Sequence, residues 1–263
     1  MEAIKTILIA IIQGISEFLP ISSSGHIVLF EDIFNFSGNS IPSNDATLEV
    51  VLHLGTLMSI LIFFKSDILS LLKGIIARDK DSAIYSIYVG IATIPVVIFY
   101  LLTNYFGYDI ESLFRVETLI YTFLFNALIL YATKYVNPKK MELSSLLVIA
   151  MGLAQVLALL PGISRSGTTI CIALLFGCNQ KIAAKFSFFM FIPAILGVLV
   201  LKLSDIQSNI EISMAILGFL FSMITGLLVL KLLFKILENQ KLWMFSFYSL
   251  IIWLISIMVR LNG

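Results

Sequence analysis

Six apolar runs of about 20 residues constrain the fold more than any other feature of the chain. A helix rises about 1.5 Å per residue, so ~20 residues cross the ~30 Å hydrocarbon core of a membrane. The runs lie at about 47–64, 83–103, 118–136, 186–203, 211–231 and 243–260. A membrane β-barrel would instead show alternating segments of about ten residues. The sequence therefore predicts an all-α polytopic membrane protein with six transmembrane helices.

Composition agrees with this prediction. Of the 263 residues, 59% are hydrophobic and only 13% are charged, whereas soluble chains carry about 25% charged residues. The net charge of +1 gives no basic surplus for binding nucleic acid. Cys171 and Cys178 are seven positions apart, about 10 Å along a helix, so we expect no disulfide between them.

Two further apolar regions, residues 4–30 and 143–178, are interrupted by polar sequence. The interruptions are QGISEFLPISSSGH (13–26) and PGISRSGTT (161–169). Each places proline, glycine and several hydroxyl groups at membrane depth. Because unpaired backbone groups cannot face lipid, each segment must be buried in protein or line a wet cavity. We therefore expect two re-entrant helix–loop–helix segments.

The two interruptions also resemble each other. Residues 13–25 align without a gap on residues 155–167, with glutamine, isoleucine, two serines and glycine in common. Three spanning runs follow each copy, so the chain is expected to form one membrane domain (1–263) built of two repeats, about 1–138 and 139–263. An odd number of spans per repeat predicts an inverted-topology duplication.

The basic residues orient this arrangement in the membrane. One set of loops holds most of them: Lys65, Lys73, Arg78, Lys80, Lys134, Lys139, Lys140, Lys181, Lys185, Lys231, Lys235 and Lys241. Basic loops mark the cytoplasmic side. Both termini and the first re-entrant segment are then expected outside, and the second segment enters from the cytoplasm. The two polar tips would meet near the midplane.

The first tip carries the parts of an activated nucleophile. Gln13 and Glu17 are four residues apart and share a helix face. A serine hydroxyl, a histidine and a carboxylate can together form a nucleophile and its base, and we assign these roles to Ser23, His26 and Glu17. The alternatives are that the serines cap the broken helix and that His26 binds a carbonyl group. The tip residues assigned to substrate binding are Gln13, Ser22, Ser24 and Gly25.

The second tip is expected to bind an anion. Arg165 stands at an apparent helix start, where backbone N–H groups and a guanidinium group point at one place and suit a phosphate. The alternative is a buried ion pair with Glu17, which is compatible with phosphate binding if the pair opens around a ligand. Residues assigned to this phosphate site are Gln155, Ser164, Ser166, Gly167, Thr168 and Thr169. Glu49, His53 and Lys185 receive no role, and Phe18, Phe186, Phe188 and Met190 are expected to be packing residues.

Four strings of the chain resemble the undecaprenyl-diphosphate phosphatases of bacteria: QGISEFLPISSSGH (13–26), LEVVLHLGT (48–56), LLPGISRSGTT (159–169) and AKFSFFMFIP (184–193). The resemblance covers the whole chain in order. It implies a phosphatase of the inner (plasma) membrane that converts undecaprenyl diphosphate to undecaprenyl phosphate and inorganic phosphate. The product is a lipid carrier for cell-wall synthesis, and the family is linked to bacitracin resistance. The resemblance also implies an active site that opens on the outer face.

By position, the resemblance makes Glu17 the catalytic acidic residue, Ser23 the nucleophile, His26 the base and Arg165 the phosphate-binding arginine. It implies a divalent cation, Mg²⁺ or Ca²⁺, for which Glu17 is the candidate ligand. Gln13 stands where the family has Glu or Gln, which removes one carboxylate from the site. Direct attack by water in place of Ser23 stays open. Expected partners are the lipid substrate and membrane lipids, with a homodimer left open.

Two other functions remain open at this point. Inverted repeats with broken helices are typical of transporters, so an inverted-repeat transporter or flippase for an anionic prenyl-phosphate lipid is the main alternative. A non-catalytic scaffold that binds lipid is the other. Buried charges such as Glu17 and Arg165 argue against the scaffold, because a site for apolar tails alone does not need them.

Overall fold

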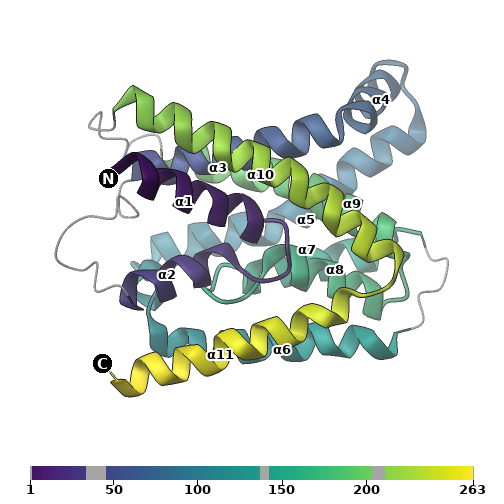
Figure 1. Cartoon of the computed structure of the whole chain (residues 1–263). Helices are drawn as coiled ribbons and strands as arrows, with labels where there is room; N and C mark the ends of the chain where they lie inside the picture. Colours follow the sequence, from purple (N-terminus) through teal and green to yellow (C-terminus); the bar gives the residue numbers. More distant parts are fainter. Residues whose placement is uncertain (1, 34–45, 137–141, 203–210, 263) are drawn as a thin grey trace.

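The computed structural model describes residues 2–33, 46–136, 142–202 and 211–262, and these residues form helices and turns without a strand (Figure 1). The helices in order are α1 (Glu2–Ser16), α2 (Ser23–Ile33), α3 (Ala46–Phe63), α4 (Lys65–Ile76), α5 (Lys80–Tyr105), α6 (Val116–Ala132), α7 (Ser145–Leu157), α8 (Arg165–Leu175), α9 (Gln180–Lys202), α10 (Ile212–Glu238) and α11 (Phe245–Asn262). Short 3₁₀ turns cover Glu111–Leu113, Thr133–Tyr135 and Leu242–Met244.

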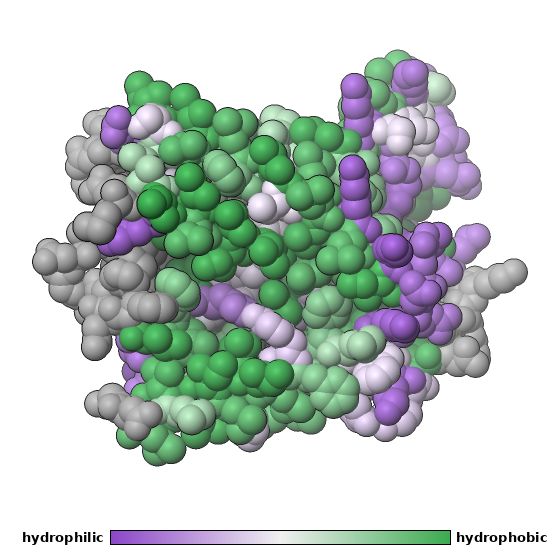
Figure 2. Space-filling view, viewed as in Figure 1, coloured by the Kyte–Doolittle hydropathy of each residue, from purple (hydrophilic) through white to green (hydrophobic). Residues whose placement is uncertain are grey.

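The long helices confirm an all-α polytopic membrane protein. Helices α5, α6 with its 3₁₀ turn, α9, α10 and α11 are each long and apolar enough to cross a membrane. Helix α3 matches the first expected span but is bent by 73° into α4, so α3 and α4 together give the sixth candidate span. Figure 2 shows apolar side chains over the middle of the visible face and hydrophilic ones gathered at the end where α4 lies.

The helices of the two halves pack across each other. The short helix α1 packs on α10, and the short helix α7 packs on α5. Helix α10 also packs on α3, α5 also packs on α9, and α6 pairs with α11 (Figure 1). The first helix of each half therefore packs on a long helix from the other half. The repeat boundary, which falls at residues 137–141 outside the described residues, stays a prediction.

Both interrupted regions form pairs of short helices. Helix α1 runs into a turn at residues 17–22, and α2 runs back from it (Figure 1). Helices α7 and α8 are joined by a turn at residues 158–164. These are the helix–loop–helix segments that the sequence predicts, and their entry from opposite leaflets stays a prediction.

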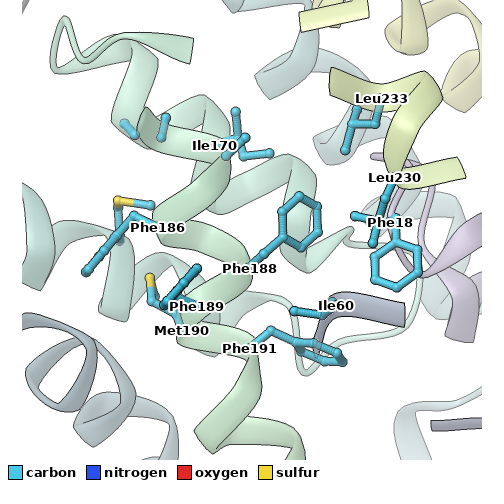
Figure 3. Packing of buried hydrophobic residues seen from close by; sticks show 14 of the residues in the cluster. Phe18, Ile60, Ile170, Phe186, Phe188, Phe189, Met190, Phe191, Leu230 and Leu233 are labelled. Atoms are coloured by element: carbon cyan, nitrogen blue, oxygen red, sulfur yellow. The ribbon is translucent and has the colours of Figure 1, made fainter. Parts of the chain in front are cut away.

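An aromatic cluster fixes the first turn against the rest of the molecule (Figure 3). Phe18, directly after Glu17, packs edge-on against Phe188 of α9 with ring centroids 5.8 Å apart. The packing roles expected from the sequence are confirmed, because these residues have no exposed surface: Phe18, Phe186, Phe188 and Met190. Edge-to-face aromatic pairs add about 0.5–1.5 kcal/mol beyond the area that they bury. The position of Glu17 is thus set by the core rather than by a loose loop.

Candidate active site

The serine-rich turn and the arginine turn touch each other. The backbone N–H of Gly162 donates to Oγ of Ser22 at 3.0 Å, and the N–H of Gly25 donates to the same oxygen at 3.3 Å. A Cβ atom on Gly25 would lie 2.8 Å from the Cα of Gly162, so only glycine allows this approach. Ser22 itself has a φ of 67°. Two segments about 140 residues apart in the chain therefore meet at one place.

Asn126 of α6 forms hydrogen bonds with both of these turns. Its Nδ2 donates to the carbonyl oxygen of Pro20 at 3.0 Å and to Oγ of Ser249 at 3.0 Å. Its Oδ1 accepts from the N–H of Ser164 at 3.1 Å. The side chain is fully buried, so these bonds satisfy groups that water does not reach. Sequence reasoning missed Asn126, although an amide in the middle of the apolar run 118–136 is a detectable signal.

An ion pair crosses between the two turns. Nη2 of Arg165 lies 3.2 Å from Oε1 of Glu17, and the two side chains are only 13% and 9% exposed. Nη1 donates to the carbonyl oxygen of Ser187 at 3.4 Å, and the guanidinium group lies 3.8 Å from the ring centroid of Phe191. Nε of Arg165 is buried and has no hydrogen-bond partner among the described residues. The structure thus brings the predicted phosphate ligand and the predicted acidic residue together.

The Glu17 carboxylate also binds the candidate nucleophile. Oγ of Ser23 donates to Oε2 of Glu17 at 3.0 Å. Nε2 of Gln13 donates to the same oxygen at 3.2 Å. The helical turn extends one turn past α1, because the N–H of Glu17 donates to the carbonyl oxygen of Gln13 at 3.0 Å, and this places both side chains on one face. Arg165, Ser23 and Gln13 therefore all converge on one carboxylate.

Among the described residues, no hydrogen bond joins His26 to Ser23. Its Nδ1 lies 2.6 Å from the carbonyl oxygen of Ser22, and its Nε2 lies 2.7 Å from the hydroxyl of Tyr248 on α11. The Tyr248 ring also stacks on the imidazole, with centroids 5.6 Å apart. A carbonyl oxygen can only accept, so Nδ1 carries the proton and Nε2 accepts from Tyr248. In this arrangement, the group poised to take the proton of Ser23 is Glu17 rather than His26.

Most hydroxyl groups of the second turn complete local structure. Oγ of Ser164 accepts from the N–H of Gly167 at 3.1 Å and caps α8. Oγ of Ser166 donates to the carbonyl oxygen of Phe18 at 3.0 Å. Oγ1 of Thr169 donates to the carbonyl oxygen of Arg165 at 2.8 Å. These residues, predicted to bind phosphate, lie behind the cavity wall: Ser166, Gly167, Thr168 and Thr169. The polar groups of Ser166, Gly167 and Thr169 bond to neighbouring helices and turns, whereas the buried hydroxyl of Thr168 has no partner among the described residues.

A cavity of about 1210 Å³ opens beside the ion pair. Its polar wall includes Gln13, Glu17, Ser22, Ser23, Ser24, Gln155, Ser164 and Arg165. The rest is largely apolar, with side chains from α3, α5 and α9 such as Leu52, Val97 and Ile195. Both polar atoms of the Gln155 amide are buried and have no partner among the described residues. Gln155 therefore lines the cavity with its hydrogen-bonding groups unused by the described residues.

Glu17 is the carboxylate beside the two turns that could bind a cation, and Glu49, which faces His53, lines the same cavity. Among the described residues, no group of three or more His, Cys, Asp or Glu side chains is placed to hold a metal ion. Mg²⁺, however, is commonly bound through one or two carboxylates together with substrate phosphates and water. Glu17 supplies carboxylate oxygen atoms on the cavity wall. The donor set fits a cation that arrives with a phosphorylated substrate, not a site built wholly from protein.

Comparison with known proteins agrees with the resemblance seen in the sequence. The family model for the bacitracin resistance protein BacA matches residues 6–255. An undecaprenyl-diphosphatase of Methanobrevibacter smithii is 37% identical over 284 residues, covering 100% of this chain and 98% of that protein. A protein of the same name from Thermosipho africanus is 38% identical and covers 96% of this chain and 98% of the relative. Another, from Halothermothrix orenii, is 34% identical and covers 98% of this chain and 97% of the relative. The chain belongs to the bacitracin resistance protein BacA family.

Proposed function

We propose that this protein is an undecaprenyl-diphosphatase, which hydrolyses undecaprenyl diphosphate to undecaprenyl phosphate and inorganic phosphate and so recycles the lipid carrier for cell-wall synthesis. The observation that carries the proposal is the convergence of Arg165 and Ser23 on Glu17 at the wall of a largely apolar cavity. The three relatives named above are called diphosphatases. No observation favours the transporter alternative.

The cavity matches the two parts of such a substrate. Its apolar wall suits a prenyl chain, which remains in contact with lipid-like surroundings. Its polar end offers the guanidinium group of Arg165 and the unpartnered amide of Gln155 to the diphosphate. Arginine is suited to phosphate because its donors form a fixed fork. Nε of Arg165 is buried without a partner among the described residues, so it could bind the diphosphate if the pair with Glu17 opens around the ligand.

The reaction follows from the hydrogen bonds already in place. Ser23 transfers its hydroxyl proton to Glu17, and its oxygen attacks the terminal phosphorus in line. The bond from that phosphorus to the bridging oxygen breaks, and undecaprenyl phosphate leaves. Water then hydrolyses the phosphoserine and releases inorganic phosphate. Arg165 stabilises the charge that develops on the phosphoryl oxygens. A direct attack by water would use the same carboxylate.

A divalent cation, Mg²⁺ or Ca²⁺, is part of the proposal. Glu17 would hold it together with oxygen atoms of the substrate and water. When bound, the cation neutralises negative charge on the diphosphate oxygens.

The orientation proposed for the membrane follows from charge. We place the protein in the inner (plasma) membrane, with both termini and the cavity mouth on the outer face. The cavity reaches the ends of α5 and α9 near the termini, at Tyr100 and Leu201. Basic residues lie in the last turns of α4 and α10, at Lys73 and Lys235, and in the turn before α5, at Arg78. Basic loops mark the cytoplasm. The homodimer stays a prediction.

The test uses purified protein in detergent, a prenyl diphosphate and an assay for free phosphate. We expect release by the wild type, loss of release in EDTA and recovery with added Mg²⁺ or Ca²⁺. Arg165→Ala should abolish turnover while the protein stays folded, and Arg165→Lys should recover only part of it, because lysine lacks the fork. A wild type that releases no phosphate would refute the function, and near-normal release by Arg165→Ala would refute the role of that residue.

A further inference from the structure

His53 of α3 reaches the active-site carboxylate through one intermediate. Its Nδ1 lies 3.2 Å from Nε2 of Gln13, which in turn donates to Oε2 of Glu17. Gln13 is only 2% exposed, and His53 and Gln13 both line the cavity. The residue pattern alone assigns no role to His53. Its Nδ1 nevertheless lies as close to Nε2 of Gln13 as Oε2 of Glu17 does, at 3.2 Å.

The chemistry of the amide determines which histidine tautomer fits. A carboxylate that pairs with Arg165 is ionised and can only accept hydrogen bonds, so Gln13 must turn its nitrogen toward Glu17. That nitrogen carries two hydrogens and no acceptor lone pair. The contact with His53 therefore requires Nδ1 to accept. The imidazole proton must sit on Nε2, the nitrogen that faces Glu49 at 3.9 Å.

This arrangement fixes the orientation of the amide. If the Gln13 amide were reversed, its oxygen would face Glu17, and two acceptors would repel each other. With Nδ1 of His53 as a second acceptor, both amide hydrogens have partners in the observed orientation only. The bond from Gln13 also ends on Oε2, the oxygen that accepts from Ser23. Whatever holds the amide therefore helps to hold the atom that takes the proton.

We propose that His53 is a positioning residue for the reaction: in its Nε2–H form it holds the Gln13 amide with nitrogen toward Glu17, and so fixes the oxygen that accepts the proton of Ser23. The kinetic part of this inference rests on the proposed function. His53 does not touch the substrate's reacting atoms in this scheme and acts through Gln13.

A double-mutant cycle tests the route through Gln13. We expect His53→Leu to lower kcat about tenfold and to change KM less than about threefold, because a displaced proton acceptor affects the chemical step. His53→Gln, which retains an acceptor oxygen, should recover kcat to within about threefold of the wild type. In a Gln13→Ala background, His53→Leu should have no further effect. The control on the same helix is Met58→Leu, which lies on the exposed surface and should leave kcat unchanged.

Additive losses in the cycle would overturn the proposal, because His53 would then act independently of Gln13. Failure of His53→Gln to recover activity, with its thermal unfolding unchanged, would also contradict it. A wild type that releases no phosphate would instead refute the proposed function and leave the tautomer to be settled by spectroscopy.

The spectroscopic test does not depend on activity. The chain has two histidines, and their contacts require opposite tautomers: Nδ1–H in His26 and Nε2–H in His53. In protein labelled with ¹⁵N-histidine at mildly alkaline pH, a long-range ¹H–¹⁵N spectrum distinguishes the two forms. His53→Gln assigns the signals by removing one set. We expect a protonated Nε2 for His53 and a changed Nδ1 shift in Gln13→Ala. A protonated Nδ1 on His53 would overturn the proposal.

Discussion

The hydroxyl of Ser23 donates its hydrogen bond to Oε2 of Glu17, at 3.0 Å, while both ring nitrogens of His26 are engaged elsewhere. A nucleophile is activated by the base that it contacts. The carboxylate is therefore positioned to receive the serine proton, and its other oxygen is held by Arg165. His26 instead bonds the carbonyl oxygen of Ser22 next to the nucleophile, which supports the turn that presents it.

Replacing Ser23 tests its role as nucleophile. Ser23→Ala should lower kcat by about 10³-fold or more, because losses of this size follow when a nucleophile is removed. The matched control is Ser24→Ala, which lies on the same cavity wall and whose hydroxyl contacts Oγ of Ser22 at 3.3 Å. It should cost less than about tenfold. Phosphate release and trapping of a phosphoserine in the wild type provide the measurement. Retention of most activity in Ser23→Ala would favour direct attack by water.

Tyr248→Phe tests whether His26 supports the turn. The substitution removes the hydroxyl that donates to Nε2 of His26 and keeps the stacked ring. We expect thermal unfolding to show a loss of about 1 kcal/mol, the usual worth of one hydrogen bond, and kcat to fall less than about tenfold. A loss of kcat as large as that of Ser23→Ala, without loss of stability, would return His26 to the role of catalytic base.

Asn126→Leu should destabilise the protein and lower activity together. It leaves the N–H of Ser164 and the carbonyl oxygen of Pro20 without their partner in a fully buried place, at about 1–3 kcal/mol for each group. Thermal unfolding in detergent measures the effect. The control is Ser256→Ala, which removes a buried hydroxyl that bonds only within its own helix, to Ile252, and should cost less than about 1 kcal/mol. Equal effects of the two changes would contradict the bridging role of Asn126.

The sequence predicts the helices and the meeting of the two turns for physical reasons. Lipid forces backbone groups into helices of a fixed minimum length, so apolar runs locate α5, α6, α9, α10 and α11. The aligned segments 13–25 and 155–167 indicate that two polar turns must share one buried place. The sequence leaves a pair of Glu17 and Arg165 as one alternative, because isolated charges at that depth are costly, and the structure shows this pair.

Other features depend on side-chain direction between distant helices, which spacing alone does not determine. Tyr248 and His53 reach the site from α11 and α3, and nothing local in their sequence indicates a partner. The run S-R-S-G-T-T is ambiguous because its hydroxyls can bind phosphate or cap the helix. The structure assigns Ser164 and Thr169 to the helix itself. No proline or glycine at the 73° bend after α3 predicts it from the sequence, because Phe63 and Phe64 occupy that position.

Two glycine substitutions in the turns and one control test whether close packing at the turns, rather than an added methyl group as such, limits stability and activity. A Cβ on Gly25 would lie 2.7 Å from Cζ of Phe123 and 2.8 Å from the backbone of Gly162. Gly162 has a φ of 91°, and its Cβ would lie 2.2 Å from Oγ1 of Thr122. Gly25→Ala must therefore push the two turns apart, and Gly162→Ala must push the arginine turn away from α6. We expect each to cost about 1–3 kcal/mol of stability and most of the activity.

The control for these changes is Gly90→Ala in the interior of α5, where a Cβ meets nothing within 4 Å. Alanine has the higher helix propensity, so this variant should unfold at the same or a higher temperature and keep full phosphate release. Thermal unfolding and phosphate release, measured on all three variants, provide the comparison. If Gly25→Ala behaves like Gly90→Ala in both measurements, the serine-rich turn and the arginine turn do not need their close contact for catalysis.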